Sequence, residues 1–199
     1  MAFRDFGYPG VELDFGLTHF EADLFSHIPA MTISAEFIDR IKTDAPLAVL
    51  VNSEKARSEF VVAPILLELR RLLGGTFGLF SGVLFDVDAS RGLTGFCDFL
   101  LTRSPFQAVL STPIVAIVEA KNDNIWNGMG QCVASMVAAR EYNSRSVPTV
   151  SPIHGVVTTG SSWKFLRLQE CALTLDTKEY FIADPARIMG ILAHILKSA

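Results

Sequence analysis

Two apolar runs within residues 95–122 carry ionisable side chains where a folded sheet usually carries aliphatic ones, and this feature most constrains the fold. The first run contains Asp98, and the second ends with Glu119 and Lys121. Side chains two residues apart on a strand point to the same face, so Glu119 and Lys121 lie side by side. Burying such groups costs several kcal/mol each unless they are paired or hold a metal. A buried ion pair is the ordinary explanation, and a cation site is the alternative.

Composition predicts a single domain without a strongly basic surface. The chain has 199 residues and a mass of 21.8 kDa, and half of its residues are hydrophobic, which is ample for one continuous core. The formal net charge of −4 and the pI of about 5.5 argue against a basic coat for nucleic acid. A protein of this charge that binds nucleic acid must therefore use a local groove and metal ions.

The cysteines and the chain start indicate a cytoplasmic protein. Cys97, Cys132 and Cys171 lack metal-ligand spacing, and two of them fall in apolar stretches, so we expect reduced, mostly buried thiols. No signal peptide is apparent at the N-terminus. No run of about 18 uninterrupted apolar residues is present, so no membrane span is expected.

The segment before the apolar runs contains a helix with a candidate inward acid. Ser53 is a helix cap candidate, and Gly74 and Gly75 follow an apolar stripe that ends at Leu73. Glu59 falls on the same stripe as Leu66, so we expect its carboxylate to face inward.

Other residues of this segment qualify the prediction. Pro64 either kinks the helix or marks a later start, which would weaken the stripe argument for Glu59. Glu54 and Glu68 are interpreted as acids near solvent.

The remaining elements follow from periodicity and turn residues. Before Ser53 we expect an irregular arm rich in Phe over residues 1–35, a short helix over 35–42 and a short apolar strand or linker over 46–51. After it we expect strands over 79–87, 95–102, 112–121, 154–159 and 163–168, and a last hairpin over 173–176 and 179–183. A linker is expected over 148–152. Helices are expected over 127–142, with Gln131 in its first turn, and over 185–197, capped by Asp184.

The order of these charged residues resembles a known superfamily. Glu59 in a helix, Asp98 in a strand, Glu119-x-Lys121 in the next strand and Gln131 in the following helix resemble the PD-(D/E)XK, or restriction endonuclease-like, nucleases. The resemblance covers about residues 53–170, and the motif's proline is replaced by a cysteine at position 97. It implies an α/β fold with a three-layer αβα core and a central mixed sheet of four to five strands.

The resemblance also implies a domain organisation. Residues 1–52 would be an N-terminal arm that packs on the core or on a second subunit. Residues 53–170 would form the nuclease-like core, and residues 171–199 would add a hairpin and a helix to the same domain.

The resemblance further implies a metal-dependent site. The cofactor would be Mg²⁺, with Mn²⁺ as a substitute, because hard cations prefer oxygen ligands. Its ligands would be Asp98, Glu119, the Ala120 carbonyl and, for a second ion, Glu59. Lys121 would orient or deprotonate the attacking water or neutralise the phosphoryl oxyanion, and Gln131 would orient a phosphate.

We therefore expect an Mg-dependent nuclease, in the first place an endonuclease that hydrolyses phosphodiester bonds of DNA. The alternative is a catalytically silent member of the same fold that serves as a binding or assembly module, which the acidic charge and the aromatic arm favour. A weaker third hypothesis is metal-assisted phosphotransfer on RNA or nucleotides. The expected partner is nucleic acid rather than a membrane, and a homodimer is left open.

Overall fold

The described chain forms one mixed sheet. The structure is a computed structural model that describes residues 1–146 and 152–197. Its strands are β1 (Thr18–Ala22), β2 (Gly78–Asp88), β3 (Leu93–Thr102), β4 (Ile114–Ala120), β5 (Ile153–Thr158), β6 (Ser162–Gln169), β7 (Ala172–Asp176) and β8 (Tyr180–Phe181). The strand order is β1-β7-β6-β5-β4-β3-β2, and β8 pairs with β6. The fold is therefore α/β, as the sequence predicts.

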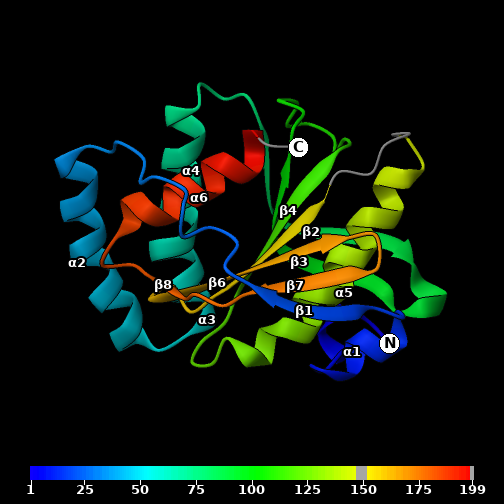
Figure 1. Cartoon of the computed structure of the whole chain (residues 1–199). Helices are drawn as coiled ribbons and strands as arrows, with labels where there is room; N and C mark the ends of the chain where they lie inside the picture. The colour runs from blue at the N-terminus through cyan, green and yellow to red at the C-terminus, as the bar shows by residue number, and fades with distance from the viewer. Residues whose placement is uncertain (147–151, 198–199) are drawn as a thin grey trace.

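Helices cover both faces of this sheet (Figure 1). They are η1 (Phe3–Asp5), α1 (Gly10–Asp14), α2 (Ala35–Val51), α3 (Glu54–Arg57), the π-helical turn η2 (Ser58–Val62), α4 (Ala63–Leu72), η3 (Ala89–Arg91), α5 (Trp126–Ser144) and α6 (Pro185–Lys197). Helices α2, α4 and α6 lie on one side of the sheet, and α5 with α1 lies on the other (Figure 1). We call these sides the α6 face and the α5 face.

Strand β4 lies inside the sheet, where the charged motif predicts a central strand. All seven of its residues are buried. It pairs antiparallel with β3 and parallel with β5, and α5 makes the crossover between the two parallel strands. The hairpin of β2 and β3 is also confirmed.

Alternation along β4 and β5 supplies two separate apolar cores. On the α6 face, Val118 and Val156 pack with the apolar stripe of α4 and with α6. On the α5 face, Ile117 and Val157 pack with α5. Because the residue that follows Val118 takes the opposite face, Glu119 points toward α5.

The sheet is larger than the four to five strands predicted, because both ends of the chain extend it. Strand β1 pairs in parallel with β7, and the expected last hairpin does not form, since β7 and β8 each pair with β6. The N-terminal segment also packs on the core, where Phe3, Phe6 and Val11 are buried. Cys97 and Cys132 are buried, and all three cysteines are free thiols.

The strand or linker expected over residues 46–51 is wrong. These residues continue α2, whose buried Phe37, Ile41, Ala45 and Ala48 recur at helical spacing, while Pro46 lies on the exposed side. The cap of α6 is confirmed, since Asp184 accepts a hydrogen bond from the Arg187 backbone at 3.1 Å. The linker expected over 148–152 lies largely outside the described residues.

No helix within the described residues is both long and apolar enough to cross a membrane.

Candidate functional site

A cleft of about 550 Å³ opens where β4 ends, and five charged or amide side chains line it. Its polar lining comes from Arg4, Glu54, Asp98, Lys121 and Gln131, and its other walls come from Ala2, Phe3, Leu84, Gly95 and Phe96. We call this space the carboxylate cleft. Three of the site residues that the sequence predicts, Asp98, Lys121 and Gln131, therefore line one cleft.

Asp98 is fixed by the strand pairing. Phe99 lies opposite Val118, so Asp98 comes opposite Glu119 one position further along the antiparallel pair. Oδ2 of Asp98 also accepts a hydrogen bond of 2.8 Å from the backbone N–H of Ala120. The two carboxylates consequently lie on the same face of the sheet, as the sequence requires for a shared cation.

Glu119 is buried beneath this lining with one oxygen unpaired. Its side chain is 0 % exposed, and Oε2 accepts a hydrogen bond of 2.8 Å from the Gln131 amide. Oε1 has no hydrogen-bond partner. Burial first, and then the charge of Asp98, raise the pKa of Glu119 well above its ordinary value of 4.5, which Lys121 only partly offsets. The charge of Lys121 therefore does not compensate for the burial of this carboxylate.

Gln131 faces the carboxylates rather than solvent. Because α5 begins at Trp126, Gln131 lies in its second turn and not in the first turn that the sequence predicts. Its amide donates to Glu119 and orients that carboxylate.

Lys121 lies directly after β4 and is held on three sides. Its backbone N–H donates to the Thr158 carbonyl at 2.7 Å, which continues the parallel ladder with β5. Nζ lies 3.4 Å from Oε1 of Glu54, and the side chain is only 13 % exposed. Its carbon stem passes over Gly128, where an added Cβ would approach Cγ of Lys121 to 2.8 Å.

Glu59 does not face inward, so this part of the prediction is wrong. Its side chain is 54 % exposed and pairs with Lys55 at 3.2 Å. The cause is the π-helical turn η2, which places Arg57 and Val61 on the buried stripe and rotates Glu59 off it. Glu59 instead lines a shallower hollow of about 400 Å³ that adjoins the cleft and that Asp98 also borders.

Glu54 is a candidate site residue that the sequence argument missed. It is half exposed, as expected for an acid near solvent, yet it borders the cleft and contacts Lys121. Ser53 starts its helix by accepting a hydrogen bond from Ala56. Only the position of Glu54 in the first turn after the Ser53 cap could have indicated a role for it in the site. The regular helical repeat could not, because the π-helical turn η2 interrupts it.

Arg57 ties this helix to the ends of both parallel strands. The residue is only 8 % exposed. Nε donates to Asn122 at 3.2 Å, after β4, and Nη1 donates to the Thr159 carbonyl at 2.8 Å, after β5. This contact positions Glu54 against the end of β4, and no sequence motif indicates it.

The donor set suits a small hard cation with few protein ligands. Within residues 1–146 and 152–197, no three His, Cys, Asp or Glu side chains come close enough to hold a metal ion. Asp98 and Glu119 would need the Ala120 carbonyl and solvent to complete the coordination. Mg²⁺ commonly keeps several waters and binds through one or two carboxylates. The unpaired oxygen of Glu119 fits such an ion, whereas Glu59 is not a ligand in this arrangement.

Comparisons with models of protein families, with curated proteins and with solved structures found no match.

Proposed function

We propose that the chain is a metal-dependent nuclease that hydrolyses phosphodiester bonds, in the first place those of DNA. The observation that carries the proposal is the unpaired Oε1 of buried Glu119, set beside the Asp98 carboxylate and below the Lys121 ammonium. An ion pair would satisfy both partners, but Lys121 pairs with Glu54 instead. A bound divalent cation would satisfy the two remaining carboxylates.

The order of elements supports a restriction endonuclease-like core. A helix that carries Glu54 precedes three antiparallel strands, and the crossover helix α5 leads to β5, which is parallel to β4. The superfamily resemblance, which rests on the order of the charged residues, implies the same arrangement. In this proposal Glu54 takes the place that the resemblance assigns to Glu59.

Each side chain then has a defined role. Asp98, Glu119 and the Ala120 carbonyl would hold Mg²⁺ or Mn²⁺, which would polarise the phosphoryl oxygens and activate a water near neutral pH. Gln131 orients Glu119 through its amide hydrogen bond. Lys121 places a positive charge where negative charge develops, and Glu54 fixes its Nζ.

The walls of the carboxylate cleft suit a nucleotide more than a simple phosphate. Leu84 and Phe96 are cross-strand partners, and they are 61 % and 66 % exposed at its edge. An exposed aromatic ring beside a phosphate site can stack on a base. Arg4 adds a positive charge on the same cleft, which matters in a chain of net charge −4.

A cleavage assay tests the proposal. The purified protein should cut single-stranded or duplex DNA with Mg²⁺ or Mn²⁺ and not with EDTA, and an RNA substrate tests the phosphotransfer alternative. Asp98→Asn keeps the hydrogen bond from Ala120 but removes the charge, so we expect kcat to fall about 10²-fold to 10³-fold. Asp86→Asn is the control, because Asp86 is exposed on β2 and does not line the cleft. A wild-type protein inert on every substrate and metal would leave only the silent binding module.

A substitution outside the charged set should also lower activity. In Gly128→Ala the new Cβ would lie 2.7 Å from Cγ1 of buried Val157 and 2.9 Å from Cε of Lys121, so one of them must move. Because a displacement of about 1 Å can cost roughly 10²-fold, we expect a fall of tenfold or more in kcat with the chain still folded. Gly10→Ala is the control, since nothing lies within 4 Å of its added Cβ. Unchanged kcat in Gly128→Ala would contradict the expected displacement of Lys121.

A further inference from the structure

Two arginines and a histidine gather on the α6 face of the sheet. His154 on β5 lies opposite Arg167 on β6, and its partner on β4 is Ala116. Residues opposite one another in an antiparallel pair point to the same face. Arg103 follows the end of β3, where its backbone N–H donates to the Pro113 carbonyl at 3.1 Å. Three strands therefore deliver basic side chains to one area.

Four side-chain nitrogens of this cluster are buried without hydrogen-bond partners. They are Nε and Nη2 of Arg103, Nε of Arg167 and Nδ1 of His154. His154 is only 6 % exposed. Across the part of the chain that the structure describes, neither arginine forms an ion pair with an acidic side chain. Both arginines are partly exposed, but a buried guanidinium nitrogen without an acceptor is costly, so an anion would stabilise the arrangement.

The charged groups that shift the pKa of His154 are all basic. The pKa of His154 is lowered to about 4, first by burial and then by Arg167, with His194 of α6 and Arg103 acting in the same direction. Only a backbone contact with Val115 opposes them, and no acidic group contributes. The area is therefore positive and partly desolvated, which strengthens any interaction with an anion.

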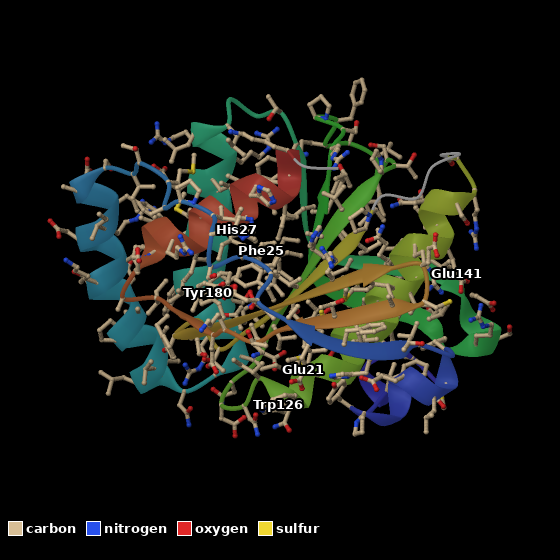
Figure 2. All side chains as sticks on the ribbon, in the orientation of Figure 1. Glu21, Phe25, His27, Trp126, Glu141 and Tyr180 are labelled. Atoms are coloured by element: carbon tan, nitrogen blue, oxygen red, sulfur yellow. The ribbon has the colours of Figure 1, made fainter. Side chains whose placement is uncertain are left out.

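The cluster is separate from the carboxylate cleft. Val157, three residues after His154, lies opposite Glu119 on β4 and packs on the α5 face. His154 shares the α6 face with Val156. Phe25, labelled in Figure 2 near α6, closes one side, with its ring centroid 5.9 Å from that of His154.

We propose that Arg103 and Arg167 bind a phosphate group on the α6 face. A guanidinium presents parallel N–H donors that match two oxygens of a phosphate, and two such groups neutralise a dianion. The phosphate group is that of free inorganic phosphate or of a nucleotide. This site does not depend on the proposed nuclease activity.

Thermal unfolding of the whole chain tests the proposal. Sodium phosphate should raise the Tm above that in sodium chloride of equal ionic strength, by about 3 to 6 °C at roughly ten times the Kd. Arg103→Gln and Arg167→Gln should each lose this increment. Lys42→Gln is the control, because it removes one positive charge from an exposed position on α2.

A second measurement protects the test against unfolded variants. Arg167→Lys keeps the charge but loses the buried Nε donor, and equilibrium dialysis with radiolabelled phosphate should show at least tenfold weaker binding than in the wild type. A phosphate increment no larger than that of chloride, or one that persists in both glutamine variants, would overturn the proposal. Equal stabilisation by acetate would overturn the assignment to phosphate.

Matched ligands then distinguish the two sources. A nucleoside monophosphate that raises the Tm more than inorganic phosphate does, with the increment lost in Arg103→Gln, identifies a nucleotide. An equal increment from both identifies the phosphate group alone. The nucleoside without phosphate should have no effect, and stabilisation by it would contradict the site.

Discussion

Lys121→Met is expected to reduce kcat for DNA cleavage by about 10³-fold while leaving the chain folded. Methionine keeps an unbranched apolar stem that can still pass over Gly128, so the loss reports the ammonium rather than the packing. Among the described residues, the Lys121 amine is the positive group that both lines the cleft and lowers the pKa of Glu119. Initial rates with saturating Mg²⁺ and DNA, measured beside a thermal melt, give the result.

Lys55→Met is the matched control for this substitution. Lys55 is 82 % exposed and pairs with Glu59, so its loss should change kcat by less than about twofold. Wild-type activity in Lys121→Met would remove the lysine from the mechanism even if Asp98→Asn were inactive. Equal losses in both lysine variants would indicate a general effect of charge.

Glu119→Gln is expected to abolish the stabilisation that Mg²⁺ or Mn²⁺ gives the wild type. At about 100 times its Kd, an ion that binds only the folded chain stabilises it by about 2.7 kcal/mol, which for a chain of this length raises the Tm by about 5 to 10 °C. Glutamine keeps the shape of Glu119 but supplies no charge for the cation. Melting curves with and without Mn²⁺ measure the difference, and they do not require activity.

The same pair of proteins should differ in pH dependence without metal. The folded chain holds the Glu119 proton more tightly than the unfolded chain, because the pKa is raised on folding. The stability that this group contributes is therefore complete below its ordinary pKa of 4.5 and is lost as the pH rises through the folded-state pKa. Glu119→Gln should lack this decline. Metal binding should release the proton, so metal affinity in the wild type should rise with pH.

Glu59→Gln supplies the control for the metal experiment. The superfamily resemblance implies that Glu59 holds a second ion or a metal-bound water, but its side chain is exposed and paired with Lys55. Its substitution should leave the metal-induced rise in Tm intact. If Glu59→Gln lost the metal-induced rise in Tm and Glu119→Gln kept it, the metal site would have to be assigned to the neighbouring hollow that Glu59 lines.

Strand periodicity predicted the part of the site that lies on the sheet. Asp98 lies within β3, Glu119 lies near the end of β4 and Lys121 follows β4, so the antiparallel pairing of β3 with β4 brings them together. Two-residue alternation is rigid, so each residue's face could be assigned. Gln131 followed from the short exit loop, although its helix starts earlier than predicted.

The helical part of the site could not be predicted in the same way. A π-helical turn adds one residue to the helical repeat between Arg57 and Val62. Counting back from Leu66 along a regular helix therefore selected Glu59, whereas Glu54 is the acid that contacts Lys121. The outer strand β1 also escaped prediction, because it is exposed along its whole length and shows no alternation. Its pairing with β7 is a long-range contact that no local pattern encodes.

The hydrogen bonds of Arg57 couple movement of α3 to movement of the loops that follow β4 and β5. One guanidinium joins α3 to Asn122 and to the Thr159 carbonyl. Separating that helix from the strands would break both bonds and leave a buried cation without acceptors. We therefore expect helix α3, which carries Glu54, and the loop after Lys121 to unfold locally as one cooperative unit.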